Sequence, residues 1–182
     1  MTTIISQYEE ARRTPSDIYL HLPLFVSLVQ ALDAKTVIEL GTRGGVSTIA
    51  WLYGVEATGG HVWSVDIDPA PELQHPQWTF IQGNDLDPTV VRQLPDAEIV
   101  FIDTSHAYQQ TMAELNVYRW KVKPGGRIVL HDTELAHPMG VPQLPRYPVK
   151  QAVEDFCFDE NLSWQNFPEN FGLGVITIPG GD

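Results

Sequence analysis

The chain has 182 residues, enough for one domain with a sizeable core but too few for two full domains. Its net charge is −12 and its 11 lysines and arginines are scattered, so nucleic acid is disfavoured as a partner. The apolar runs are too short to span a membrane, no basic and apolar leader opens the chain, and the single cysteine, Cys157, cannot form an internal disulfide. We therefore expect a cytoplasmic protein without a membrane partner.

Helical and strand patterns alternate along the chain from about residue 18 onward. A helix is expected over 18–32, capped by Ser16 or Asp17, with Pro23 as a point where it could split. Strands are expected over 36–40, 61–65, 78–81, 99–102 and 127–130, the last after a turn at 124–126. Helices are expected over 46–55, 87–94, 108–122 and 149–158, and two closing strands over 162–167 and 172–178.

This order of elements predicts the fold class. Short apolar strands that alternate with helices are typical of a parallel sheet covered on both faces. The closing strands are separated by too few residues for a crossover, so they form an antiparallel hairpin. We expect one domain over 1–182, with an N-terminal helix region at 17–35. Residues 36–178 would form a doubly wound α/β core with a seven-stranded mixed sheet that ends in the antiparallel hairpin.

A glycine-rich turn follows the first expected strand. Its spacing over 41–45 is G-x-x-G-G, which lacks the middle glycine of the dinucleotide-binding G-x-G-x-x-G pattern. Glu39 lies two residues before Gly41, and a buried carboxylate there would repel a pyrophosphate and favour a cationic or hydrogen-donating ligand. The sulfonium and amino group of S-adenosylmethionine meet that requirement. A tight strand-to-helix turn without any ligand is the alternative.

Two further acids follow the next strands. Asp66 closes the second strand about 20 residues after the glycines, where nucleoside-binding folds place the acid that receives ribose hydroxyls. Asp85 follows the third strand and could accept a hydrogen bond from an adenine amino group. Each acid also has an ordinary loop interpretation, such as an Asp that starts a turn. Three acids after three successive strands favour the nucleoside interpretation.

The fourth strand leads into the candidate chemistry. His106 lies three residues after Asp103, and a histidine with an ordinary pKa of about 6.5 suits a general base near neutral pH. Asp103 could contact the cofactor, orient His106 or bind a metal. The alternative for His106 is a loop residue that forms local hydrogen bonds. A proline-rich loop over 137–148 could cover the acceptor as a lid.

The fifth strand ends in His131 and Asp132, next to the expected end of the fourth. Asp103 and Asp132 could hold Mg²⁺, which usually takes one or two carboxylates with water and substrate. His131 would shift such a site toward a transition metal if it also coordinated. A hydrogen-bonded His–Asp pair without a metal is the alternative.

In these motifs the chain resembles the class I S-adenosylmethionine-dependent methyltransferases. It is most similar to the methyltransferase-24 type, relatives of the macrocin and cephalosporin-hydroxylase-like group and more distantly of catechol O-methyltransferases. The matching segments are DIYLHLPLF, VIELGTRGGVST, VWSVDID, IVFIDTSHAY, VKPGGRIVLHD and FGLGVITI, spread over about 17–178. The resemblance implies a Rossmann-like core. It also implies that Asp66 holds the ribose, that Asp85 holds the adenine, and that the methionine end is lined by Glu39, Gly41, Thr42, Arg43, Gly45 and Ser47.

The resemblance also limits the chemistry. A catalytic lysine stands at the position of His106 in the catechol-type relatives, and the metal-dependent relatives carry further carboxylate or amide ligands where this chain has His131 and Thr133. We expect methyl transfer to a hydroxyl of a small-molecule acceptor with His106 as base, and a homodimer could complete the acceptor pocket. The main alternative is a nucleoside-binding regulatory or interaction domain without turnover. The residues do not identify the acceptor.

Overall fold

The sheet determines the architecture of the computed structural model, which describes residues 3–136 and 145–181. Seven strands lie in the order β3-β2-β1-β4-β5-β7-β6. The first five run parallel, and β7 is antiparallel to both β5 and β6. This is the predicted mixed sheet with a closing hairpin. The strands are β1 (Thr36–Leu40), β2 (His61–Asp66), β3 (Trp78–Gln82), β4 (Ala97–Ile102), β5 (Val122–His131), β6 (Ser163–Phe167) and β7 (Leu173–Thr177).

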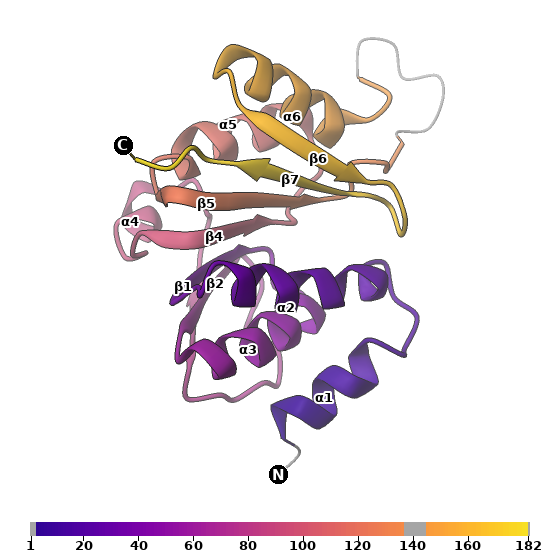
Figure 1. Ribbon diagram of the computed structural model, residues 1–182, viewed down its shortest axis with the longest axis vertical. Coiled ribbons are helices and arrows are strands. Elements are labelled where there is room, and N and C mark those ends of the chain that lie inside the picture. Colours follow the sequence, from indigo (N-terminus) through magenta and orange to yellow (C-terminus); the bar gives the residue numbers. More distant parts are fainter. Residues whose placement is uncertain (1–2, 137–144, 182) are drawn as a thin grey trace.

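Helices cover both faces of the sheet (Figure 1). On one face, α1 (Ile4–Ala11) and α2 (Leu22–Ala31) both pack against α3 (Val46–Thr58). The other face carries α5 (Tyr108–Tyr118) and α6 (Pro148–Asp159), which contact each other, and the short α4 (Pro88–Val91). None of the helices in the described ranges is long and apolar enough to cross a membrane.

The two cores follow from the alternation of side chains along each strand. In β1, Val37 packs toward α2 and α3, whereas Ile38 and Leu40 belong to the core beneath α5 and α6. Phe25 of α2 stacks on Trp51 of α3 with ring centroids 4.2 Å apart. Because parallel strands are buried on both faces, they read as nearly continuous apolar runs. That is why their positions could be predicted from sequence.

The N-terminal helices differ from the prediction. The helix expected over 18–32 is broken, because a 3-10 turn (Tyr19–His21) comes first and α2 begins only at Leu22. The N-cap position of α2 is His21, which makes no side-chain capping hydrogen bond, so neither Ser16 nor Asp17 caps this helix. Ser16 Oγ instead accepts a hydrogen bond from the Ile18 amide. The helix α1 was not predicted at all.

The segment before the fifth strand also differs. The helix expected over 108–122 ends at Tyr118, and β5 already starts at Val122, so the expected turn at 124–126 lies within the strand. The pairing of β4 with β5 shifts register there, between Ala97 and Ile99. Gly126 permits this irregularity, because a Cβ atom there would lie 2.5 Å from the carbonyl oxygen of Glu98. The expected lid over 137–148 falls mostly on residues 137–144, which lie outside the described ranges.

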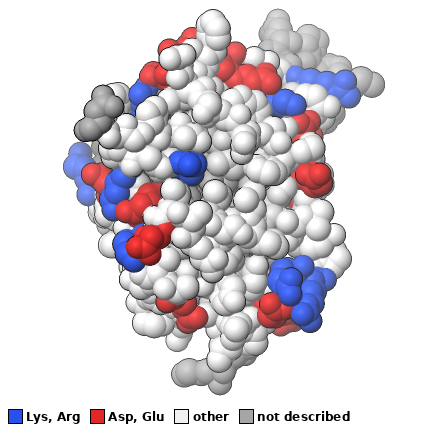
Figure 2. All heavy atoms as spheres, in the orientation of Figure 1, with Lys and Arg blue, Asp and Glu red and all other residues white. Residues whose placement is uncertain are grey.

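Figure 2 shows how charged side chains are distributed over one face of the protein. On that face, the described lysines and arginines form small separate groups beside acidic residues, and large areas between them are uncharged. A basic stripe of the kind that follows a phosphate backbone is not seen among the described residues there.

The site is positioned by the sheet order. The order in which successive strands are added to the sheet reverses between β1 and β4, which are parallel neighbours, and ligands of such sheets bind beyond the carboxyl ends of the strands at this point. Gly41 brings the two strand ends into contact: its φ is +86°, and a Cβ atom at this position would lie 1.9 Å from the carbonyl oxygen of Asp103. Only glycine allows this approach.

We therefore expect Gly41→Ala to lower the free energy of unfolding by roughly 2 to 4 kcal/mol, since the backbone must shift and adopt an unfavourable conformation. Gly44→Ala is the matched control. Nothing lies within 4 Å of a Cβ atom at Gly44, so its cost should stay within about 0.5 kcal/mol. Urea unfolding of both variants measures the difference, and equal stabilities would contradict a role for this close approach.

Candidate functional site

A cavity of about 380 Å³ opens at the carboxyl ends of β1 to β4. Five of the residues predicted to bind a cofactor line it: Gly41, Arg43, Asp66, Asp85 and Asp103. Gln110 of α5 also lines it, which the strand-end pattern could not reveal. Glu39, Thr42, Gly45 and Ser47 are not among the lining residues, so the structure divides the predicted set in two.

The carboxylate of Asp66 closes the glycine-rich turn. Its Oδ2 accepts hydrogen bonds from the amides of Thr42 and Arg43, at 2.7 and 2.9 Å, and its Oδ1 accepts from the Asp68 amide at 2.9 Å. Burial opposes ionisation of Asp66, but these backbone donors outweigh it and lower the pKa of its carboxyl group. Asp66 is therefore an anion held in place at the end of β2, on the wall of the cavity.

Glu39 lies behind this turn and is completely buried. Three hydroxyl groups donate to its carboxylate: Ser47 Oγ at 2.7 Å, Thr48 Oγ1 at 2.7 Å and Ser64 Oγ at 2.5 Å. Burial without a cationic partner raises the pKa of Glu39 to about 7, although the hydroxyls oppose that shift. Glu39 thus ties β1, β2 and α3 together, and Ser47 faces Glu39 rather than the cavity.

Asp85 lies at the opposite end of the cavity. Its side chain is largely buried, and Gln110 Nε2 approaches its Oδ1 at 3.3 Å. Glu114 of α5 lies beside it, fully buried, and accepts hydrogen bonds from Thr104 Oγ1 and Gln110 Nε2. Sequence reasoning missed Glu114, because it stands within a helix rather than after a strand.

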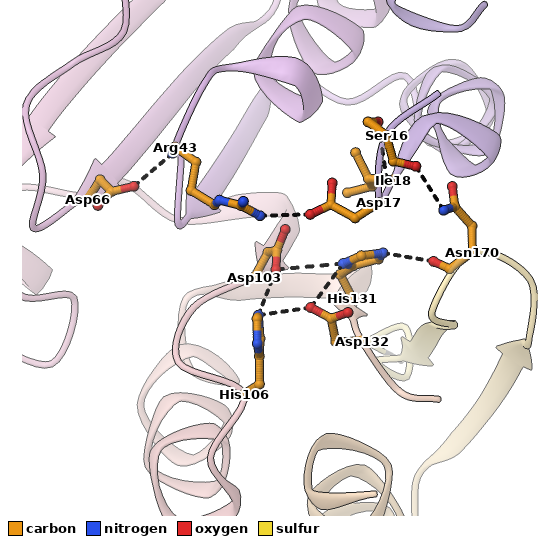
Figure 3. Close-up of polar contacts among 10 residues, drawn as sticks. All are labelled: Ser16, Asp17, Ile18, Arg43, Asp66, Asp103, His106, His131, Asp132 and Asn170. Atoms are coloured by element: carbon orange, nitrogen blue, oxygen red, sulfur yellow. Dashed lines mark hydrogen bonds and ion pairs between the residues drawn. The ribbon is translucent and has the colours of Figure 1, made fainter. Parts of the chain in front are cut away.

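Four side chains converge beside the cavity, from the ends of β4 and β5 (Figure 3). His106 Nε2 lies 2.8 Å from Asp132 Oδ2 and 3.3 Å from Asp103 Oδ1. His131 Nδ1 lies 3.2 Å from the same Asp132 oxygen and 3.7 Å from Asp103 Oδ1. His106 and Asp132 both have positive φ, +56° and +63°, an uncommon backbone conformation that turns their side chains toward one another.

The two carboxylates determine the protonation of the two imidazoles. Hydrogen bonds to Asp103 and Asp132 raise the pKa of His106 to about 9. Burial opposes the charging of His131, yet the same two carboxylates raise its pKa to about 10. The pKa of Asp132 lies well below its usual range, because both imidazoles donate to it against the effect of burial. In the ligand-free protein the cluster is therefore two ion pairs at neutral pH.

The same cluster has the donors of a metal site. One ligand atom each from Asp103, His131 and Asp132 lies within 4.8 Å of the others. His131 Nε2 donates to the carbonyl oxygen of Asn170 at 3.1 Å, which leaves Nδ1 facing the carboxylates. An outer hydrogen bond of this kind fixes the tautomer of a metal-binding histidine. Two carboxylates and one imidazole fit Mg²⁺ or a first-row transition metal, so the residues present fit a divalent cation.

An N-terminal segment closes the site from the side. Asn170, in the β6–β7 turn, donates from Nδ2 to the Ser16 carbonyl and accepts from the Leu20 amide. Arg43 reaches out of the glycine-rich turn to Asp17, with Nη1 2.8 Å from Oδ2 (Figure 3). The pattern of strand ends contains no signal for Asp17 or Asn170, because neither follows a parallel strand.

Comparison with known proteins gives the class that this fold and site define. The family model for a methyltransferase domain matches residues 38–133, more than half of the chain, and the chain belongs to this family. The match covers the glycine-rich turn, Asp66, Asp85 and the His–Asp cluster. It confirms the resemblance drawn from the motifs.

Individual relatives carry more particular names. A rhamnosyl O-methyltransferase of Mycobacterium leprae (strain TN) is 26% identical over 147 residues, which are 74% of this chain and 61% of that protein. A rhamnosyl O-methyltransferase of Mycobacterium tuberculosis (strain H37Rv) is 23% identical over 172 residues, 81% of this chain and 70% of that protein. The chain therefore spans less than two thirds of the length of the first of these relatives.

Solved structures share the fold. A putative caffeoyl-CoA O-methyltransferase from Staphylococcus aureus superposes with a TM-score of 0.72 at 17% identity, over 98% of this chain and 93% of that one. The methyltransferase MycE, solved with Mg, SAH and mycinamycin VI, gives a TM-score of 0.73 at 16% identity, over 98% of this chain and 54% of that one. Both confirm the methyltransferase architecture of the seven-stranded sheet.

The buried Glu39 predicts a pH dependence of stability. Its pKa is about 7 in the folded protein and about 4.5 when unfolded, so the folded state binds the proton more tightly. Its contribution to stability is therefore highest below pH 4.5 and declines by up to about 3 kcal/mol as the pH rises through 7. Relative to wild type, Glu39→Gln should become progressively more stable from pH 5 to pH 8.

Glu98→Gln is the matched control for this measurement. Glu98 is only partly buried. Burial acts to raise the pKa of its carboxyl group, but the contacts with Lys123 and the Thr36 amide outweigh burial and lower that pKa. Glu98 is mostly ionised from pH 5 to 8 in both states, so the stability difference between this variant and wild type should change by only a few tenths of a kcal/mol there. Denaturant unfolding at several pH values measures both, and a constant difference for Glu39→Gln would contradict the raised pKa.

Proposed function

We propose that the protein is an S-adenosylmethionine-dependent O-methyltransferase that methylates a hydroxyl group of a small molecule. The observation that carries this proposal is the position of Asp103, which lines the cavity with one face and pairs with His106 on the other. A cofactor in the cavity would then present its methyl group next to the His–Asp cluster. Relatives and neighbours named as O-methyltransferases, and neighbours solved with SAH, support the same reaction.

The electrostatics of the cavity favour this cofactor over a dinucleotide. Asp66, Asp85 and Asp103 line it, and the chain carries a net charge of −12, so a pyrophosphate would meet repulsion whereas a sulfonium cation would be attracted. We assign the ribose hydroxyls to Asp66 and the adenine to Asp85. Gly41 and Arg43 would face the methionine part. Glu39, Thr42, Ser47 and Gly45 would support the turn from behind.

His106 is the group that we propose to receive the hydroxyl proton. Methyl transfer is a displacement that requires the acceptor oxygen in line with the methyl group and relieved of its proton. Asp132, 2.8 Å from His106 Nε2, would stabilise the imidazolium that forms. Because the pKa of His106 is about 9 in the ligand-free protein, the imidazole must release its own proton before it can act as a base.

Asp103, His131 and Asp132 are the residues that would hold a divalent cation. Such a cation supplies Lewis-acid polarisation of an acceptor oxygen, which lowers the pKa of the hydroxyl group. The rhamnosyl name of the relatives and the mycinamycin VI bound to MycE support a hydroxyl acceptor of small-molecule size. A pocket completed by a second copy of the chain remains a prediction.

Calorimetric titration with S-adenosylhomocysteine tests the cofactor. We expect S-adenosylhomocysteine to bind to the wild-type protein and NAD not to bind. Asp66→Asn should weaken binding about tenfold or more, because it removes a charged hydrogen-bond acceptor from the cavity. Asp33→Asn, at an exposed site before the amino end of β1, should leave affinity unchanged. Binding of NAD without S-adenosylhomocysteine would contradict the proposal.

Turnover tests the base and the metal. In a screen of hydroxyl compounds that follows S-adenosylhomocysteine release, His106→Ala should lower kcat about 100-fold or more without weakening cofactor binding, whereas His75→Ala should have no effect. Exhaustive chelation should lower the rate, and added Mg²⁺ or Mn²⁺ should restore it. An unchanged rate in His106→Ala would contradict the proposed role of His106 as general base. An unchanged rate after chelation would contradict a catalytic metal ion. Cofactor binding without turnover on any acceptor would favour the regulatory alternative.

A further inference from the structure

Two buried carboxyl groups share one hydrogen-bond donor beneath the end of the cavity that Asp85 lines. Glu114 is completely buried, Asp85 is 8% exposed, and Gln110 Nε2 lies 2.8 Å from Glu114 Oε1 and 3.3 Å from Asp85 Oδ1. The other two oxygens, Asp85 Oδ2 and Glu114 Oε2, are buried, and no group in the described part of the chain donates to either. Two neighbouring carboxylates this deeply buried do not both ionise, so one proton is shared between them.

The remaining contacts show where that proton resides. Glu114 Oε1 accepts from Thr104 Oγ1 at 2.6 Å and from Gln110 Nε2 at 2.8 Å, which uses both of its lone pairs. Glu114 is the more deeply buried of the two carboxyls, so it keeps the proton, and Oε2 is the oxygen left to carry it toward Asp85. Burial, followed by the contact with Asp85, raises the pKa of Glu114 to about 8. Asp85 Oδ1 keeps only a 3.3 Å approach from Gln110 and remains open to the cavity.

Few charged groups surround this pair. Among the described residues, the hydrogen-bond donors to Glu114 are Thr104 and Gln110, and both are uncharged. Tyr118 donates its hydroxyl to the Asp85 backbone carbonyl at 2.7 Å, and burial and the two carboxyls hold the pKa of Tyr118 above its usual range. Tyr118 therefore stays neutral, and the loss of the shared proton would leave two adjacent anions without a counter-charge.

We propose that Glu114 is a positioning residue: it holds one proton against Asp85, so that Asp85 presents only a hydrogen-bond acceptor to the cavity. This inference rests on the proposed cofactor. It names the chemistry that the site selects, which is a ligand base with an exocyclic amino group. A base with an oxo group at the same position would place one acceptor against another, at the cost of an unmade hydrogen bond to a buried charged group.

The variant Glu114→Gln tests the shared proton. Its amide N–H can donate to Asp85 Oδ2 at every pH, and its carbonyl can accept from Thr104 and Gln110, so folding and neutral-pH affinity should be kept. We expect the affinity of wild type for S-adenosylhomocysteine to fall about tenfold more than that of Glu114→Gln between pH 7 and 9.5. Titration of the ligand and of the His–Asp cluster affects both proteins equally and cancels in this comparison.

Selectivity is measured on the wild-type protein with S-inosylhomocysteine, in which an oxo group replaces the amino group. We expect it to bind about 10- to 100-fold more weakly than S-adenosylhomocysteine. Parallel pH profiles of wild type and Glu114→Gln, or equal affinities for the two ligands, would overturn the inference while leaving the proposed function intact. Absence of S-adenosylhomocysteine binding to both proteins at pH 7 would instead overturn the proposed function.

Discussion

The close approach of Gly41 to the carbonyl of Asp103 is the contact on which the rest of the site depends. It joins the turn after β1 to the loop after β4, and the Asp103 amide donates in return to the Leu40 carbonyl at 2.8 Å. Because of this contact the cavity and the His–Asp cluster share one residue, Asp103. A larger side chain at position 41 would separate the cavity from the cluster, and with them the methyl group and the base that we propose.

The site buries several acids and stabilises each by a different means. Asp66 is satisfied by backbone amides and stays ionised at the mouth of the cavity. Glu39 has only hydroxyl donors, and its pKa therefore rises to about 7. Asp103 and Asp132 are neutralised by two imidazoles. In the pair formed by Asp85 and Glu114, one shared proton replaces a counter-charge. Each solution follows from the donors within reach, because a buried charge without partners is very costly.

These differences assign different tasks to residues of one chemical type. Asp66 and Asp85 carry acceptor oxygens that face the cavity, which suits the hydroxyl and amino groups of a nucleoside. Asp103 and Asp132 hold charge beside an imidazole, which suits proton transfer or a divalent cation. Glu39 and Glu114 have no exposed oxygen and act only through their neighbours. A count of acidic residues in the cavity would not separate these three roles.

The sequence by itself determined where strands and helices alternate along the chain and which strand ends carry the polar groups. Parallel strands are buried on both faces, so β1, β2 and β4 appear as short, largely apolar runs. Asp66 is the last residue of β2, Asp85 follows β3, and Asp103 and His106 follow β4. The prediction failed where local pattern competes with tertiary contacts. α1 was missed, α2 starts at Leu22 behind a 3-10 turn, and the glycines at 125 and 126 lie inside β5 rather than before it.

Only the tertiary structure decided what each side chain contacts. Glu39 and Ser47 were expected to face the ligand, but three buried hydroxyls surround the Glu39 carboxylate behind the turn. Glu114 lies in the middle of a helix and Asn170 in a distant hairpin turn, so neither has a local signal. Their roles arise from contacts between segments far apart in the chain, which spacing along the sequence does not encode. The sequence located the site at the edge of the sheet, and folding determined which carboxyl groups face the ligand and which support it.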